Sequence, residues 1–389
     1  MVTHQAVNNA VVEITQYMLN SVSQEGSWGT VDYTDWGPII SALNVEHLLR
    51  CGLSIEDTWT VQNDTYLYQC SIKKCLEYLS KQIHDDGSFG ADFWDTCKLA
   101  TIIVEQNLYS YFDYARIHSY ILQFVHDGGL QIQANDYSQS AEWSGPGTYA
   151  ACAYYLFCAD EKDLANSVLS DVISLQQSDG SFVGKKTRTG DNVIHPIWHT
   201  AQMLRTILKS KFCYDADLVQ KTTHWIKSIQ GDNGEYDDFG QFVTYYTAYA
   251  ALAYLSLPKR PQPNTDRSIG YLLRKTRNGK VDDFGGTIMT AQALSAYLNP
   301  NDLINVYQTI QISNAKKLLA ENLQLKEEVR SLSEKIKEYD SKYADSDIIL
   351  SKKDVWKLSL WFGFITLVLG IIAPALINII VDLASNTAE

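Results

Sequence analysis

Basic charge, paired cysteines and strand-like alternation are scarce in this sequence, and each shortage argues against a class of protein. The formal net charge is −13, so a basic face for phosphate backbones, and hence nucleic-acid binding, is not expected. The seven cysteines are odd in number and form no CxxC pair, which favours reduced cytosolic thiols over a disulfide framework or a structural zinc site. Because alternating apolar and polar residues are nearly absent, the fold class predicted is all-α.

A secretory signal peptide is also not apparent, since the opening MVTHQAVNNAVVEITQYMLN is typical of an ordinary amphipathic helix. Long uncharged stretches are otherwise missing, but residues 358–381 carry no charge at all and are long enough to cross a bilayer. The sequence therefore predicts a single transmembrane helix over residues 355–382 and a short tail over 383–389.

The charges around this stretch predict its orientation. Lys352, Lys353 and Lys357 precede it, and only acidic residues follow. Positive charge prefers the cytoplasmic side of a membrane. We therefore expect a single-pass protein with a C-terminal anchor in the lipid bilayer and a cytoplasmic N-terminal domain.

Residues 306–350 have the apolar repeat of a coiled coil. The a positions are Ala315, Asn322, Val329, Ile336 and Tyr343, and the d positions are Leu318, Leu325, Leu332 and Tyr339. β-Branched residues at a with Leu at d favour two strands, and a lone Asn at a fixes their register. The sequence predicts a parallel homodimer here; a single amphipathic helix against the globular part is the alternative.

The first 305 residues contain an internal repeat, which is a marker of ring-like or solenoid folds. Six glycine-containing turns, 41 to 61 residues apart, include QEGSWG, DDGSFG, QQSDGSFVG and QGDNGEYDDFG. A small, apolar helical stretch follows each turn, and a more polar helix precedes most of them. Six such pairs favour an α/α6 toroid, with the small apolar helices on the inside. The first and sixth repeats depart most from the pattern, so closure of the ring is left open.

The repeat resembles the α/α toroid superfamily, which contains class II terpene cyclases such as squalene–hopene cyclase and the β subunits of protein prenyltransferases. The Q-x-x-D-G-S-W/F-G turn is similar to the QW-type motif of the cyclases. The resemblance covers about residues 5–300 and implies that all six inner helices start at the same rim. Twelve residues at those starts are candidates for a site: Trp36, Asp92, Trp94, Asp95, Glu142, Trp143, His195, Trp198, His199, Tyr245, Tyr246 and Met289.

Asp92-Phe93-Trp94-Asp95-Thr96 resembles the D-x-D-D-T motif with which class II terpene cyclases protonate an alkene. Asp92 and Asp95 match the first and third aspartates, and Trp94 stands in place of the middle one, which the family uses as the acid. Asp95 and Asp92 are the candidate catalytic residues. The alternative makes Asp92 the N-cap of a helix and Asp95 a carboxylate of its first turn.

Residues 127–143 and 191–204 resemble the prenyltransferase segments that lie near the zinc, and the second places His199 on the zinc-binding histidine. The Asp-x-Cys pair of that family is missing. His195 and His199 are four residues apart and could share a metal, but a stable site normally needs three protein ligands. We therefore expect no cofactor, with zinc or magnesium as the weaker alternative.

Aromatic and basic residues near the predicted rim could bind an isoprenoid. The aromatic candidates could line an apolar cavity or simply fill the barrel. A basic loop before the fourth inner helix could hold a diphosphate or be merely solvated. The ligand-binding candidates are Trp36, Trp94, Trp143, Trp198, His199, Tyr245, Tyr246, Lys185, Lys186 and Arg188.

Two functions follow from these features. The first is a toroid that binds a hydrophobic, isoprenoid small molecule and has lost catalysis, acting as a sensor or membrane effector. The second is an active terpene cyclase or prenyltransferase tethered to the membrane. A third hypothesis, glycan hydrolysis, has only Asp95 and Glu142 as a carboxylate pair on separate inner helices.

Overall fold

The computed structural model describes residues 2–29, 37–62, 67–126, 129–130, 145–183, 196–210, 216–237, 242–281 and 285–343. The chain divides into two compact units, Met1–Thr309 and Ile310–Glu389. Several predictions fall outside the described residues: those for Trp36, Glu142, Trp143, Lys185, Lys186, Arg188 and His195, and the span over 355–382 with its tail.

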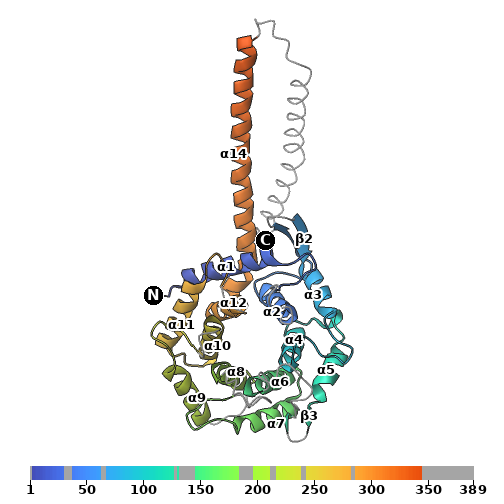
Figure 1. The fold of residues 1–389 in the computed structure, drawn as a ribbon, viewed down its shortest axis with the longest axis vertical. Helices are drawn as coiled ribbons and strands as arrows, with labels where there is room; N and C mark the ends of the chain where they lie inside the picture. Colours follow the sequence, from blue (N-terminus) through green and yellow to red (C-terminus); the bar gives the residue numbers. More distant parts are fainter. Residues whose placement is uncertain are drawn as a thin grey trace. The chain divides into compact units, whose positions relative to one another are not determined.

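The first unit is a closed ring of paired helices (Figure 1). The outer helices are α1 (His4–Ser21), α3 (Ile72–Ser80), α5 (Tyr114–Leu122), α7 (Lys162–Ile173), α9 (Ala216–Ser228) and α11 (Gln262–Lys275). The inner helices are α2 (Gly37–Arg50), α4 (Phe93–Glu105), α6 (Pro146–Cys158), α8 (Pro196–Lys209), α10 (Val243–Ser256) and α12 (Gly286–Tyr297). The predicted α/α toroid is confirmed at the level of the fold.

The inner helices are buried on nearly every side, which explains their small, apolar composition. In α10, every residue from Tyr246 to Tyr254 is buried, and four of them are alanines. A helix that is apolar all round belongs in the interior. By contrast, the outer helices bury one stripe; α11 buries only Thr265, Ser268, Ile269 and Leu272. The core therefore lies between the two layers and between neighbouring inner helices.

In the five repeats whose turns lie in the described ranges, one hydroxyl group of the inner helix binds the backbone of the turn. In the second repeat, the backbone N–H of Phe89 donates to Thr96 Oγ1 over 3.0 Å, and the Thr96 hydroxyl donates back to Phe89 O. The same bond recurs in four other described repeats, between Trp28 and Ser41, Phe182 and Thr200, Tyr236 and Thr247, and Val281 and Thr287. The aromatic or apolar residue of the turn is thus buried with its backbone satisfied.

The turn glycines hold each repeat against the next one. Gly87 has a φ of +96°, and a Cβ there would lie 2.5 Å from the carbonyl oxygen of Arg116 in the next outer helix. Gly279, in the sixth turn, has the same relation to Glu13 of the first outer helix, with a Cβ distance of 2.2 Å. Only glycine combines this backbone conformation with so close an approach. Because α12 also packs against α1 and α2, the sixth repeat closes the ring.

The structure also contains two short antiparallel hairpins, which the all-α prediction did not include. Strand β1 (Thr58–Gln62) pairs with β2 (Leu67–Ser71), and β3 (Val125–His126) pairs with β4 (Gly129–Leu130). Helix α3 begins at Ile72, directly after the second strand, with Ser71 as its N-cap. A single turn of 3-10 helix, η2 (Tyr109–Tyr111), and the short α13 (Pro300–Ile304) complete the described elements of the ring unit.

The long helix α14 (Val306–Tyr343) begins at the end of the first unit and continues into the second. Leu318, Leu325 and Leu332, at predicted d positions, are 45%, 53% and 46% exposed. The helix covers residues 306–343 of the predicted coiled coil, and the parallel dimer stays a prediction. None of the helices in the described ranges has the length and apolar character needed to cross a membrane.

Candidate functional site

The start of α4 carries the two aspartates of the cyclase-like motif, and both of them cap the helix. Asp92 is the N-cap, with Oδ1 accepting the backbone N–H of Asp95 over 2.9 Å. In return, Asp95 Oδ2 accepts the N–H of Ala91 over 2.8 Å. This reciprocal arrangement resembles a capping box. It satisfies two backbone donors that the helix itself cannot pair.

The two carboxyl groups are nevertheless unusual caps, because both are buried. Asp92 is 5% exposed and Asp95 is fully buried. Burial raises the pKa of Asp92, and burial together with the nearby Asp92 raises that of Asp95. Asp92 Oδ2 and Asp95 Oδ1 find no hydrogen-bond partner among the described residues. The pair therefore tends to keep a proton at a pH where an exposed aspartate would have lost it.

Trp94 occupies the place of the cyclase acid and belongs to an aromatic layer across the ring. Its ring meets that of Trp198, on α8, edge to face at a centroid distance of 5.9 Å. Trp198 in turn meets Tyr249 of α10 at 6.3 Å, and Tyr249 lies 4.9 Å from Tyr245. Trp94, Trp198 and Tyr249 are at most 4% exposed. We call these four residues, with Tyr246, the aromatic layer.

Gly147 on α6 makes the contact between the two tryptophans feasible. Helix α6 lies between α4 and α8 in the ring, so a side chain there would separate Trp94 from Trp198. A Cβ on Gly147 would lie 2.6 Å from the Trp198 ring. Because glycine has no side chain, the indole of Trp198 can occupy the space beside Gly147.

His199 is a buried structural residue in the same region. Its Nδ1 accepts the backbone N–H of Gly147 over 2.9 Å, which links α8 to the first turn of α6. The weaker alternative paired it with His195 on a metal, and His195 lies outside the described residues. Within the described ranges, no three His, Cys, Asp or Glu side chains are grouped closely enough to hold a metal ion.

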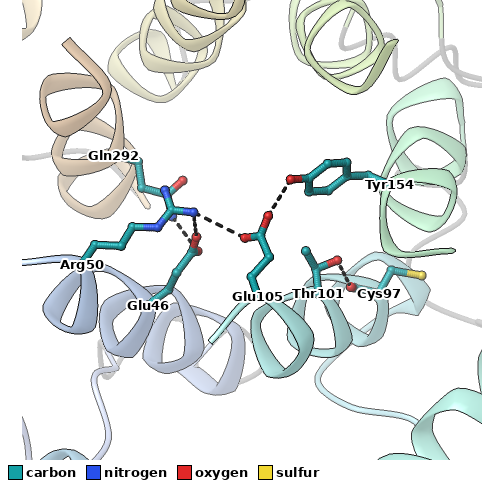
Figure 2. Close-up of polar contacts among 7 residues, drawn as sticks. All are labelled: Glu46, Arg50, Cys97, Thr101, Glu105, Tyr154 and Gln292. Atoms are coloured by element: carbon teal, nitrogen blue, oxygen red, sulfur yellow. Dashed lines mark hydrogen bonds and ion pairs between the residues drawn. The ribbon is translucent and has the colours of Figure 1, made fainter. Parts of the chain in front are cut away.

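The opposite end of the inner helices carries a polar network that the sequence-based candidates did not include (Figure 2). Arg50 Nη2 lies 2.8 Å from Glu46 Oε1 and 3.4 Å from Glu105 Oε2. Gln292 Nε2 donates to Glu46 Oε2 over 3.3 Å, and the Tyr154 hydroxyl donates to Glu105 in a short hydrogen bond. These five side chains come from α2, α4, α6 and α12 and point toward one another inside the ring.

Three further cations lie near this network. They are Lys98 of α4 and Arg205 and Lys209 of α8, and the Lys209 ammonium lies 5.0 Å from the centre of the Tyr154 ring. Burial would raise the pKa of Glu46, but Arg50, Lys98, Lys209 and Arg205 together lower it to about 2. Burial, with Arg205 beside it, lowers the pKa of Lys209 to about 7.

Helical spacing explains why the two ends differ, and it was visible in the sequence. Trp198, Gln202, Arg205 and Lys209 are spaced by four, three and four residues, so they form one stripe along α8. On α4 the same stripe is Trp94, Lys98, Thr101 and Glu105. Each stripe runs from an aromatic residue at the helix start to a charged residue at its end. Along α4 and α8, the inner surface of the ring therefore begins with a tryptophan and ends with a charged residue.

Solved structures share this fold. No protein-family model and no curated protein matches the sequence. The type II terpene cyclase MstE from Scytonema is 13% identical, and the match covers 78% of this chain and 99% of that one with a TM-score of 0.55. A protein from Actinoplanes is 14% identical, covering 76% and 99%, with a TM-score of 0.53. An alpha-1,6-mannanase from Salegentibacter is 14% identical, covering 76% and 98%, with a TM-score of 0.46.

The likeness is one of fold. At such low identity it establishes the α/α toroid of type II terpene cyclases and no activity. Of the predicted site residues, Asp92, Asp95, Trp94, Trp198, His199, Tyr245 and Tyr246 lie at the starts of α4, α8 and α10, at the end of the ring that holds the aromatic layer. Met289 is buried in the first turn of α12.

Proposed function

We propose that this protein binds a hydrophobic, isoprenoid ligand inside its ring, against the aromatic layer, without protonating it. The observation that carries the proposal is the position of Trp94. It stands where the cyclase motif has its acid, and its ring packs on Trp198 in an aromatic layer contributed by α4, α8 and α10. Flat aromatic faces suit the branched, unsaturated chain of an isoprenoid.

Two further observations support the proposal, one for the ligand class and one for binding without catalysis. The structural neighbour MstE has been solved with geranylgeranyl dihydroxybenzoate, which is its substrate and carries an isoprenoid chain. In the present chain, both aspartates that match the cyclase motif cap α4 through the backbone of Asp95 and Ala91. Carboxyl groups engaged in this way support a binding protein, because a proton donor must be aimed at the alkene.

An active cyclase is the second candidate, and the buried carboxyl pair favours it. Asp95 has a raised pKa and one oxygen without a hydrogen-bond partner among the described residues. A neutral, buried carboxyl group is the state that an acid catalyst needs. In this alternative Asp95 replaces the missing middle aspartate as the proton donor. Prenyl transfer is the less supported variant, since no metal ligand set accompanies His199 in the described chain.

We further propose that the ring is carried on a dimeric coiled coil and a membrane anchor. The exposed leucines at positions 318, 325 and 332 support the coil, and the uncharged residues 358–381 support the anchor. Such an arrangement would hold the ring at a cytoplasmic membrane surface, where isoprenoids partition. Ligand binding could then be transmitted to the membrane, as a sensor or effector requires.

The decisive experiment is organic extraction of the purified full-length protein followed by mass spectrometry. A binding protein is expected to release an unchanged isoprenoid, and Trp94→Ala should release much less of it. The proposal fails if the protein converts an added polyprenyl substrate and Asp95→Asn abolishes that conversion, because Asp95 would then be the acid. Asp113→Asn, at the exposed N-cap of α5, is the matched control.

A further inference from the structure

The charged end of the ring has more positive than negative charge, although the whole chain is strongly acidic. Four cations, Arg50, Lys98, Arg205 and Lys209, lie close enough to influence one another electrostatically, and the carboxylates beside them are Glu46 and Glu105. The net charge of the chain is −13. A concentration of positive charge inside such a protein is not explained by solubility and points to a ligand.

The two carboxylates are already engaged by other partners. Glu46 pairs with Arg50 and accepts a hydrogen bond from Gln292, and Glu105 pairs with Arg50 and accepts one from Tyr154 (Figure 2). Among the described residues, no carboxylate lies within ion-pairing distance of Lys98, Arg205 or Lys209. Both carboxylates therefore form their ion pairs with Arg50, and the other three cations have no carboxylate as a direct counter-ion.

These three cations belong to the inner surface. Lys98 lies one helical turn after Trp94 on α4, and Arg205 and Lys209 lie two and three turns after Trp198 on α8. Since Trp94 and Trp198 touch across the ring, their stripes face the same interior. All three cations are half-buried, and burial is the main cause that lowers the pKa of Lys98 and of Lys209. Bringing like charges together in partly desolvated positions is unfavourable unless an anion joins them.

We propose that Lys98, Arg205 and Lys209 bind an oxyanion, such as a phosphate or diphosphate, on the inner surface of the ring, between the middle of α4 and the end of α8. Arg205 and Lys209 lie toward the end of α8, whereas Asp92 and Asp95 lie at the start of α4; Lys98 lies one turn after Trp94, in the middle of α4. Guanidinium and ammonium groups together provide the charged hydrogen-bond donors that a phosphate group accepts. The inference rests on the proposed function in one respect: it makes the ligand an amphiphile, with its chain on the aromatic layer and its acidic head at this site.

The test compares three probes on the full-length protein in a nonionic detergent. Geranylgeranyl diphosphate has both a chain and an acidic head, geranylgeraniol has only the chain, and inorganic pyrophosphate is the free anion. Binding is followed by the fluorescence of the tryptophans or by calorimetry. We expect the diphosphate to bind at least tenfold more tightly than the alcohol. Binding of pyrophosphate alone identifies a site for a free anion, and its absence identifies a site for a lipid head group.

Variants of Lys98 and Lys209 test whether these cations cause the tighter binding of the diphosphate. Lys98→Met with Lys209→Met should reduce the affinity for the diphosphate at least tenfold and leave that for geranylgeraniol unchanged. Lys98→Arg with Lys209→Arg should restore most of the affinity, which a folding defect would not allow. Lys221→Met, on the outer helix α9, is the control.

The inference is overturned if the Met variants keep the affinity for the diphosphate, or if they lose both isoprenoids equally. A different result would exclude the proposed function and leave the anion site supported. Pyrophosphate binding that depends on Lys98 and Lys209, without any binding of geranylgeraniol, would support the anion site and exclude the hydrophobic ligand.

Discussion

Lys209→Met is expected to make the ligand-free protein more stable at neutral pH. Lys209 is the cation most affected by its surroundings, since burial and the neighbouring Arg205 lower its pKa from 10.5 to about 7. A methionine has a similar shape and no charge to desolvate. Binding sites often hold such unfavourable charges, and removing them commonly stabilises a protein while it reduces function.

The magnitude follows from the pKa difference. One pKa unit corresponds to about 1.4 kcal/mol, so the folded state loses at most about 5 kcal/mol by holding Lys209 charged. The side chain keeps some contact with solvent, which screens the charges, and the variant also loses the contact with the Tyr154 ring, about 0.5–1 kcal/mol. We therefore expect a gain of about 1–3 kcal/mol in the free energy of unfolding at pH 7.

The pH dependence has a definite sign. Between about pH 7 and 10.5 the unfolded chain keeps the Lys209 proton and the folded chain has lost it, so this group makes the wild type more stable as the pH rises. The Met variant lacks that contribution, and its advantage should shrink by pH 9.5. The assay is urea unfolding of both proteins under reducing conditions, followed by circular dichroism at pH 7 and pH 9.5.

The exposed Lys221→Met on α9 should change stability by less than about 0.5 kcal/mol at either pH. A Lys209→Met protein that is no more stable than the wild type at pH 7, with no change at pH 9.5, would refute the reasoning. The charge of Lys209 would then be compensated within the ring without any ligand.

Three further predictions concern the framework. Thr96→Val leaves the buried N–H of Phe89 unpaired and should lower the free energy of unfolding by about 1–3 kcal/mol, whereas Thr96→Ser should keep most of it, as measured by urea unfolding. Gly147→Ala places a Cβ 2.6 Å from the Trp198 ring, so it should destabilise the protein by about 1–3 kcal/mol and alter its tryptophan fluorescence; unchanged values would contradict the close contact. Leu325→Lys should convert a dimer to a monomer in sedimentation, and a monomeric wild type would remove the coiled coil.

The repeated turns made most of the ring predictable. A glycine turn followed by small apolar residues recurs six times, and each recurrence marked the beginning of an inner helix. The N-cap role of Asp92 was also among the alternatives, because an aspartate before a helix start is a common cap. The hairpin at 58–71 was missed although Thr58–Gln62 alternates polar and apolar residues and buries Trp59 and Val61; each of its strands has only five residues, which is a short signal.

The candidate site was predictable only at one end. Trp94, Trp198, Tyr245 and the two aspartates were chosen because they stand at helix starts, where the related motif lies. The charged end was overlooked, although the spacing from Trp198 to Lys209 could have revealed it. Spacing alone shows which residues share one face of a helix. It does not show whether that face points into the ring, and charged faces usually point to solvent.

The sequence by itself determined the helical repeat and the order of its parts, because hydrophobic period, turn glycines and helix caps act over short distances. The tertiary structure decided the closure of the ring, through Gly279 against Glu13, and the meeting of Trp94 with Trp198 over Gly147. It also decided that Lys98 and Lys209 face a common interior. These are contacts between distant parts of the chain, and they depend on how helix pairs turn relative to one another, which no local pattern specifies.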